Sequence, residues 1–155
     1  MKANIFKVPI VKIKQVRQRT VLYNSPICTP ENIVSMLKPI YHDIDREQFV
    51  VVGMNAQNFP NVVNIVSIGT LNSTQVGPRE VFKPLILSNC LTFICVHNHM
   101  GGTLEPSNHD VYITKTLAEL GDKLEIKLLD HIIIGFDDSY YSFSKSGRMP
   151  VVGKG

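Results

Sequence analysis

Apolar side chains recur at strand-like spacing in some stretches of the chain and at helical spacing in others. Residues 11 to 14 alternate apolar and lysine side chains, a period-2 pattern that predicts a short strand with one polar face. Residues 30 to 41 carry apolar side chains at helical spacing. Thr29 is an N-cap candidate, Pro30 suits the first helical position and Glu31 lies in the first turn, so a helix is predicted over 30–41.

The rest of the chain alternates short apolar stretches with two further helical ones. Glycine, proline and asparagine mark the turns between them. Strands are predicted over 48–54, 62–68, 91–96, 126–134 and 140–143. One further helix is predicted over 78–89, with Pro84 inside it. Another begins at a capping box at residue 107 and ends at about residue 124. Strands interleaved with three helices indicate an α/β or α+β domain, in which a central mixed β-sheet is flanked by helices.

Composition places the chain among ordered, compact proteins. With 155 residues, 44% of them hydrophobic and 19% charged, it can form one domain with a real core. The cysteines, Cys28, Cys90 and Cys95, are odd in number, and no stretch has the signature of a signal peptide or reaches the roughly 20 apolar residues of a membrane helix. We therefore expect a soluble, cytoplasmic protein without disulfides that does not contact a membrane.

The net charge of +3 conceals an asymmetry. Residues 1 to 20 hold six of the 16 basic side chains and no acid, which leaves ten basic against 13 acidic residues in the rest of the chain. Such an arm could bind phosphate groups or an acidic partner, but the favoured interpretation is a solvated edge strand whose lysines discourage pairing. The six residues are Lys2, Lys7, Lys12, Lys14, Arg17 and Arg19.

The side chains that suggest a metal site lie between residues 97 and 110. His97 and His99 are two residues apart at the end of a predicted strand, so both imidazoles project to one face and can reach one metal ion. A glycine-bearing loop follows, and Ser107 and Asp110 then begin a helix, where the carboxylate can supply a third ligand. Two imidazoles, one carboxylate and an open position for water form the ligand set of a hydrolytic zinc site. The same donors also describe a non-haem iron site.

Each of these residues also has a purely structural interpretation. The histidines could be satisfied strand-end residues, Asp110 an acid in a helix first turn and Ser107 an N-cap. Cys95 shares the strand parity of the histidines, but four residues of extended chain separate it from His99 by about 13 Å, too far to share an ion. Core positions are therefore predicted for Cys90 and Cys95, and structural or surface positions for His109 and His131.

The spacing of these residues resembles that of the JAMM metallopeptidases, the JAB/MPN domain, and within them the RadC-like bacterial proteins. Their pattern is an upstream glutamate, then H-x-H, seven residues, serine, two residues and aspartate, and this chain keeps every spacing from His97 to Asp110. Stretches at 68–70, 78–80 and 128–135 are also similar. The resemblance covers about residues 46–148, with an N-terminal arm, strand and helix over 1–45 and a tail over 149–155. It implies a JAMM (MPN) fold, which is cytidine-deaminase-like.

By this resemblance the protein would be a zinc-dependent hydrolase that cleaves a peptide or isopeptide bond in a peptide or protein substrate. His97, His99 and Asp110 would bind one zinc ion, Glu47 would be the general acid/base, and Ser107 would help to stabilise the oxyanion. Spacing alone does not distinguish Glu47 from Glu80 or Glu105. No HNH-nuclease, zinc-deaminase, H-E-x-x-H, P-loop or dinucleotide-binding motif competes with this interpretation.

Two departures from the RadC-like pattern affect the expectations. These proteins usually read H-N-H-P-S-G, whereas this chain has Met100 and Gly101 before Gly102, so its loop lacks a rigid proline. The family name suggests a role in DNA repair, but the residues before Glu47 do not include the helix-hairpin-helix segment that would support it.

The second hypothesis is a DNA-associated or mobile-element accessory protein, in which the metal site is structural and the basic arm does the binding. The substrate and the oligomeric state, including a homo-oligomer, are left open.

Overall fold

A five-stranded sheet and three helices make up the fold. The computed structural model of the chain describes residues 9–42, 44–69 and 76–153, so Lys2 and Lys7 of the arm and the last two residues of the tail lie outside the described part. In chain order the elements are α1 (Pro30–Tyr41), β1 (Gln48–Met54), β2 (Pro60–Ile68), α2 (Pro78–Leu87), β3 (Thr92–Asn98), α3 (Asn108–Lys123), β4 (Lys127–Ile134) and β5 (Tyr140–Ser142). The predicted mixed sheet flanked by helices is confirmed.

The sheet has the strand order β2-β1-β3-β4-β5. β1 pairs antiparallel with both β2 and β3, and β4 pairs antiparallel with β5. β3 and β4 are parallel, and α3 makes the crossover between them. As a result, the carboxyl end of β3 and the amino end of α3 are joined by one short loop, over residues 99–107.

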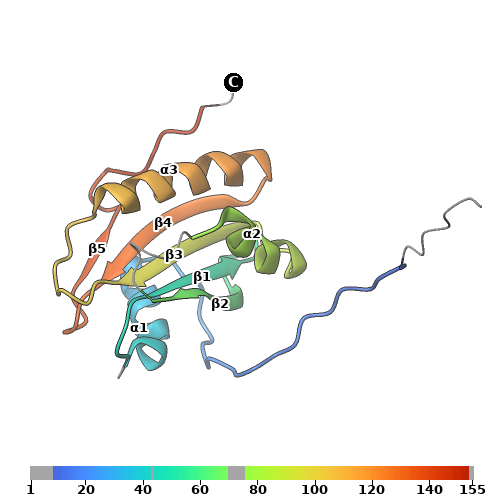
Figure 1. Cartoon of the computed structure of the whole chain (residues 1–155), viewed down its shortest axis with the longest axis horizontal. Coiled ribbons are helices and arrows are strands. Elements are labelled where there is room, and N and C mark those ends of the chain that lie inside the picture. Colours follow the sequence, from blue (N-terminus) through green and yellow to red (C-terminus); the bar gives the residue numbers. More distant parts are fainter. Residues whose placement is uncertain (1–8, 43, 70–75, 154–155) are drawn as a thin grey trace, which may run out of the picture.

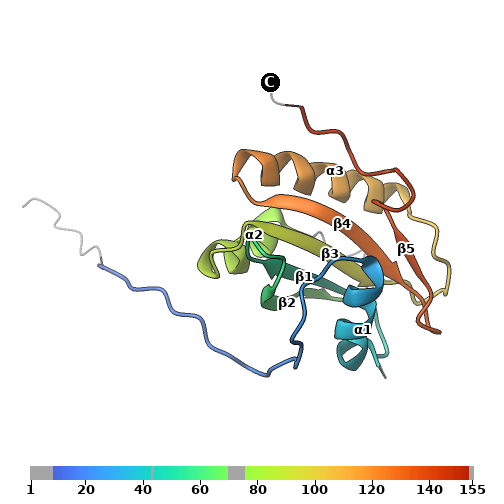
Figure 2. The same cartoon turned by 180° about the vertical axis from the view of Figure 1, so that it is seen from behind.

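Helices cover both faces of the sheet, and each face has its own hydrophobic core. α3 runs along β4 on one face and α1 lies on the other (Figures 1 and 2). The α1 side of the core includes Ile33 and Leu37 against Val50, Val52 and Val96. Because side chains alternate along a strand, the neighbouring residues of β1 and β3 point to the other face, toward α2 and α3.

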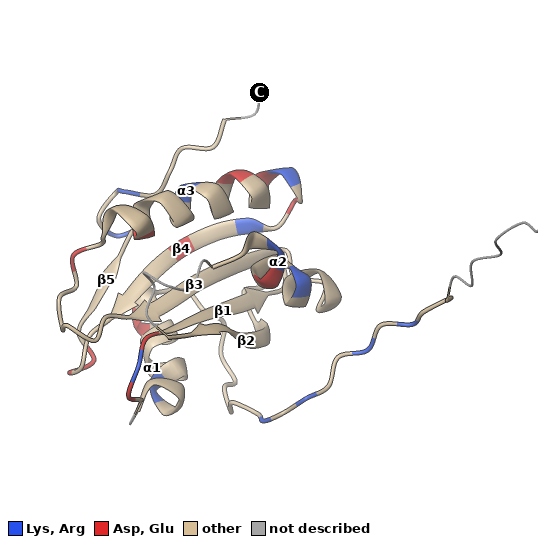
Figure 3. Ribbon diagram, viewed as in Figure 1, with Lys and Arg blue, Asp and Glu red and all other residues tan. Residues whose placement is uncertain are grey.

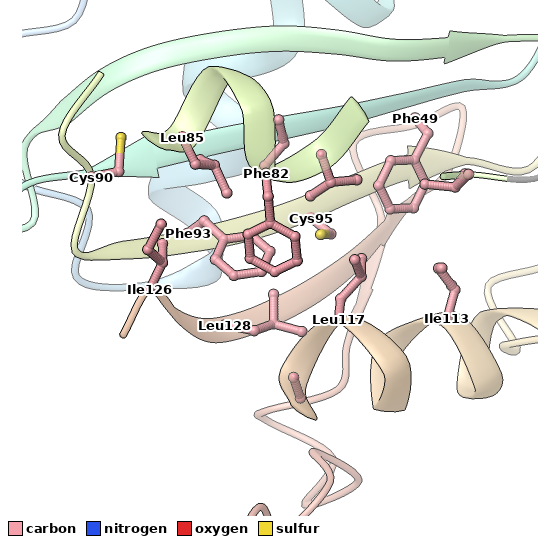
Figure 4. Close-up of a cluster of buried hydrophobic side chains, with 14 residues drawn as sticks. Phe49, Phe82, Leu85, Cys90, Phe93, Cys95, Ile113, Leu117, Ile126 and Leu128 are labelled. Atoms are coloured by element: carbon pink, nitrogen blue, oxygen red, sulfur yellow. The ribbon is translucent and has the colours of Figure 1, made fainter. Parts of the chain in front are cut away.

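The core on the α2 and α3 side contains buried phenylalanine residues. Figure 4 shows Phe82 of α2 next to Phe93 of β3, with a ring-centroid distance of 5.4 Å, and Leu117 of α3 pointing into the same cluster. Cys90 and Cys95 are buried here, as predicted. This packing fixes α3 against the sheet and thereby sets where its first turn lies.

The strand predicted over residues 11–14 is wrong. Residues 9–24 contain neither helix nor strand, and Figure 3 shows this basic segment leading away from the sheet. Ile10, Val11 and Ile13 are at least 69% exposed. An alternating pattern makes a strand only when a neighbouring strand satisfies its backbone. Gln15 of this segment instead contacts the end of α2, where its side-chain amide donates to Ser88 Oγ at 2.7 Å.

The other predicted boundaries differ little from the structure. α1 and β1 occupy the predicted ranges, whereas α2 ends at Leu87, two residues early, because Asn89 turns into the left-handed region at φ 51°. β3 extends through His97 to Asn98. Among the described residues, no helix has the length and apolar character needed to cross a membrane.

Candidate metal centre

Two histidines lie where β3 ends. His97 is the penultimate residue of β3 and is fully buried, while His99 is the first residue of the loop and is partly buried. Their imidazoles face each other with the Nε2 atoms 2.9 Å apart, as expected for residues i and i+2 on an extended backbone. His99 Nδ1 lies 2.8 Å from the carbonyl oxygen of Thr103, so the loop holds the second ring in place.

The first turn of α3 brings a carboxylate to these rings. Ser107 is the N-cap, and the predicted capping box is present: Ser107 Oγ accepts a hydrogen bond from the Asp110 N–H at 3.1 Å. In return, Asp110 Oδ2 accepts hydrogen bonds from the Ser107 N–H and Oγ–H, both at 2.7 Å. The cap thus fixes the Asp110 side chain, which is 1% exposed and points toward the histidines.

The three side chains form one compact donor set. Asp110 Oδ1 lies 3.2 Å from His97 Nε2, and Asp110 Oδ2 lies 3.3 Å from His99 Nε2. One ligand atom from each residue falls within 4.8 Å of the others. Donors bound at 2.0–2.2 Å to a tetrahedral ion lie roughly 3.3–3.6 Å apart, so this set could hold a divalent cation with little movement. The donors suit zinc and also iron.

Burial and mutual contact shift the pKa values of the three groups in different directions. Burial lowers the pKa of His97, against the opposing effect of Asp110. For His99 the hydrogen bond with Asp110 is the largest effect and raises the pKa. Burial alone would raise the pKa of Asp110, but the contacts with His97 and His99 outweigh it and hold the pKa well below its ordinary value. An ionised carboxylate next to a neutral His97 is the protonation state that a cation requires.

Glu47 lies just before β1, beside the histidines. In the antiparallel pairing of β1 with β3, Phe49 is opposite His97, so continuing the register places Glu47 opposite His99 and on the same face of the sheet. The Glu47 carboxylate adds to the raised pKa of His99 and partly offsets the lowering of the His97 pKa by burial. Its backbone carbonyl accepts a hydrogen bond from the Gly69 N–H at 2.9 Å.

The two other candidate glutamates are engaged elsewhere. Glu80 of α2 lies 3.8 Å from Lys83, with a half-exposed side chain. Glu105 accepts a hydrogen bond from Arg148 at 2.9 Å, and its side chain is 72% exposed. Asp110 and Glu47, in contrast, both act on the pKa values of the two histidines. The role of Glu47 in catalysis and that of Ser107 stay predictions.

Asn98, between the two histidines, points away from them toward the segment that carries Glu47. Its Oδ1 accepts a hydrogen bond from the Gln48 N–H at 2.8 Å, and its Nδ2 donates to the Arg46 carbonyl at 3.4 Å. The amide therefore bonds to the peptide groups on both sides of Glu47. His109 is half-buried on α3 and lies outside the donor set, as predicted.

His131 contacts the metal centre directly, which spacing in the sequence did not reveal. This fully buried residue of β4 has its Nε2 2.9 Å from His97 Nδ1, and its Nδ1 is 2.6 Å from Thr114 Oγ1. A structural position was predicted for it, and its burial agrees with that. The available signal was the polar pair Asp130-His131 inside an otherwise apolar strand, because buried polar groups require partners.

A cavity of about 550 Å³ opens beside His99 on the α1 side of the sheet. Asn98 and His99 form one wall. Much of the rest is lined by side chains of α1, β4 and the following turn, namely Val34, Tyr41, Ile134 and Phe136. The Lys38–Asp138 ion pair also lines the cavity. His99 of the metal centre therefore borders a concave surface whose volume is within the range of ligand pockets.

Comparison with known proteins agrees with this geometry. Residues 27–148 match the sequence profile of the RadC-like JAB domain, which includes all three metal-centre residues as well as α1. The chain belongs to the RadC-like JAB domain family. The resemblance found in the motif is thereby confirmed, and so is the JAB/MPN-like fold. The match to the family profile begins at residue 27 and therefore includes α1, the helix that packs on the sheet.

Relatives of this chain include several UPF0758 proteins. That of Rubrobacter xylanophilus is 38% identical over 123 residues, which cover 79% of this chain and 53% of the relative. That of Caldanaerobacter subterraneus is 42% identical over 112 residues, covering 72% and 48%, and that of Bacillus licheniformis is 42% identical over 120 residues, covering 77% and 53%. The chain thus spans about half the length of these curated relatives.

Proposed function

We propose that this protein is a zinc-dependent hydrolase of the JAMM type that cleaves a peptide or isopeptide bond. The observation that carries the proposal is the convergence of His97, His99 and Asp110 within 4.8 Å at the end of β3, in a chain of the JAB domain family. The three side chains are 11% exposed or less, which is unusual for such polar groups unless they are paired or bind an ion.

The chain supplies each part that the hydrolysis requires. His97, His99 and Asp110 would hold the cation. A bound zinc ion would lower the pKa of its water to about 7 and polarise the substrate carbonyl. Glu47, on the same face of the sheet, would take a proton from the attacking water and pass it to the leaving nitrogen as the C–N bond breaks and a C–O bond forms.

Ser107 could stabilise the oxyanion only if its hydroxyl changes its hydrogen-bond partner. Its hydroxyl donates to Asp110 Oδ2 at 2.7 Å, so in the structure its proton orients a metal-centre carboxylate. A hydroxyl that stabilises an oxyanion must instead donate to the substrate oxygen. We propose that Ser107 rotates to do so once substrate is bound, while its main-chain N–H keeps the second hydrogen bond to Asp110.

The cavity beside His99 is the proposed binding site for the substrate. Its apolar lining and the Lys38–Asp138 pair suit a peptide segment that presents an apolar side chain next to a polar backbone. Of the three metal-centre residues, His99 lines the cavity, so a peptide bound there would contact the metal centre at that residue.

Metal analysis and one conservative substitution test the proposal. Purified wild-type protein should contain about one zinc ion per chain, and His97→Ala and Asp110→Ala should not. Glu47→Gln should keep the zinc and lose hydrolysis of a peptide or isopeptide substrate library. Glu105→Gln, a matched change at an exposed glutamate paired with Arg148, should leave both unchanged. Iron in place of zinc, or equal losses in the two glutamate variants, would contradict the mechanism.

The basic arm supports a second candidate function, binding of nucleic acid. Within the described arm, Lys12, Lys14, Arg17 and Arg19 are exposed on a segment that leads away from the sheet, and no acid lies among residues 9–24 (Figure 3). Such a segment can follow a phosphate backbone. This function needs no hydrolysis and could coexist with it.

Salt dependence distinguishes this second function. If the arm binds DNA, affinity should fall steeply with salt, and Lys12→Ala with Lys14→Ala should reduce the slope of log K against log salt by about 2. Glu47→Gln should leave DNA binding unchanged. Binding that persists undiminished after deletion of residues 1–20 would contradict the arm as the binding segment.

A further inference from the structure

A line of hydrogen bonds runs behind the metal centre from one ligand to another. It begins at the main-chain carbonyl of Asp110, which accepts from Thr114 Oγ1 at 2.5 Å. Thr114 Oγ1 lies 2.6 Å from His131 Nδ1, and His131 Nε2 lies 2.9 Å from His97 Nδ1. The line therefore connects α3, β4 and β3, and joins the backbone of Asp110 to the ring of His97.

The carbonyl end sets the direction of every hydrogen bond in this line. A carbonyl oxygen only accepts, so the single hydroxyl proton of Thr114 is used on Asp110. The lone pairs of Thr114 Oγ1 must then accept from His131 Nδ1–H. If His131 carries one proton, its Nε2 accepts in turn from His97 Nδ1–H. His97 Nε2 is then the bare nitrogen, and this is the atom that faces His99 and Asp110.

The surroundings of His131 favour a single proton on its ring. The residue is fully buried, with the Phe143 ring stacked on it at a centroid distance of 5.3 Å and the Phe49 ring edge-on at 5.5 Å. Both ring nitrogens meet neutral partners, a hydroxyl and an imidazole. A second proton would place a positive charge in a fully buried site where no carboxylate of the described residues contacts the ring, which is costly in a protein interior.

We propose that His131 and Thr114 are positioning residues that fix His97 in the tautomer able to bind a metal ion. Most metal-binding histidines are oriented by a carboxylate, a carbonyl or water. Here the buried His131 orients His97, and the Thr114 hydroxyl on α3 orients His131 in turn. The inference rests on the proposed metal site but not on hydrolysis.

The line also couples the two elements that supply ligands. Thr114 is one turn after Asp110 on α3, so the same turn of helix presents the carboxylate to the ion and the hydroxyl to His131. A displacement of α3 along the sheet would therefore disturb His97 as well as Asp110.

Zinc affinity of two variants at residue 114 tests the proposal. Thr114→Val removes the hydroxyl with little change of shape, whereas Thr114→Ser keeps it. Loss of such an orienting group commonly lowers metal affinity 10- to 100-fold, and we expect about that loss for Thr114→Val and less than about threefold for Thr114→Ser. Thr116→Val is the matched control, because Thr116 Oγ1 makes the same type of bond, to Tyr112 O at 3.0 Å, on the exposed side of α3. Competition with a chelator measures all four affinities.

The tautomer of His131 gives a readout that packing alone would not change. Nitrogen-15 spectra of the imidazoles should show the His131 proton on Nδ1 in wild type, with or without zinc. In zinc-free Thr114→Val, Nδ1 has lost its acceptor and the proton should move to Nε2, where it can donate to His97. His131→Gln, which offers an oxygen to His97 Nδ1–H, should retain more zinc affinity than His131→Phe.

The outcomes separate this inference from the proposed function. A wild-type His131 proton on Nε2, or equal zinc affinities for Thr114→Val and Thr116→Val, would overturn the inference. Failure of wild-type protein to bind zinc would contradict the proposed function instead, and the tautomer spectra of the zinc-free protein would still decide the direction of the hydrogen-bond line.

Discussion

Asn98 Oδ1 accepts a hydrogen bond from the main-chain N–H of Gln48 at 2.8 Å. The same side chain donates to the Arg46 carbonyl at 3.4 Å, so one amide holds the two peptide groups that flank Glu47. Asn98 is 7% exposed and belongs to the strand that carries the two histidines. The separation of the proposed general base from the metal centre is therefore fixed through the residue between the two ligands.

This relationship predicts the effect of Asn98→Ala. The variant should keep its zinc, because Asn98 is not a ligand, but kcat should fall roughly 10- to 100-fold, since small displacements of catalytic groups have effects of that size. The lost bond leaves the Gln48 N–H without its partner and should also reduce stability by about 1–3 kcal/mol. Asn61→Ala, which removes a bond from an exposed asparagine to Ser88 O at 3.2 Å, serves as the control. Equal kcat values for the two variants would argue against this role.

Zinc should stabilise the folded protein because the donor set is assembled only in the native state. At a free zinc concentration 100 times the Kd, the gain in unfolding free energy is about 2.7 kcal/mol, or a rise in Tm of roughly 5–10 °C for a domain of this size. Asp110→Asn keeps an acceptor for the capping box but loses the negative charge, so its Tm should respond little to zinc. Thermal melts with and without added zinc measure the difference. A similar rise in both proteins would indicate binding elsewhere.

Local signals made much of the fold predictable. Pro30 at a helix start and Ser107 with Asp110 in a capping box each fix a boundary through contacts within one turn, and the apolar run at 48–54 has no other place than the interior. The strand predicted at 11–14 failed for the opposite reason. Strand formation depends on a partner that the alternation itself does not specify.

The same distinction applies to the metal centre. His97 and His99 are related by strand geometry and Asp110 by its helix cap, so their spacing carried information about their positions. His131 and Thr114 reach the site only because β4 pairs with β3 and α3 packs on the sheet. No fixed spacing along the chain expresses those contacts, and they became visible only with the tertiary structure.

Close packing of α3 on the sheet depends on Gly121. A Cβ at this position would lie 2.5 Å from the main-chain oxygen of Ile126 and 3.3 Å from the Phe93 ring. Gly121→Ala gains about 0.5–1 kcal/mol of helix propensity, but a clash with backbone costs typically 1–3 kcal/mol, so a net loss of about 1–2 kcal/mol is expected. Urea unfolding measures it. Gly101→Ala, where a Cβ meets nothing within 4 Å, should change stability little, and a loss as large as that of Gly121→Ala would refute the packing explanation.

Acid should weaken the contact between α1 and the segment around β5. Glu31 accepts hydrogen bonds from Lys145 at 2.6 Å and from the Tyr140 hydroxyl, and these, Lys145 first, lower its pKa from 4.5 to about 2. Because the folded state holds the ionised form, the stabilisation is fully present above pH 4.5 and is lost as the pH falls toward about 2. Wild type should therefore have a higher Tm than Glu31→Gln near neutral pH, and the difference should vanish over that acid range. Glu119→Gln, at an exposed pair with Lys115 on α3, provides the comparison, and a Tm difference for Glu31→Gln that stays constant down to about pH 2 would show that charge is not its source.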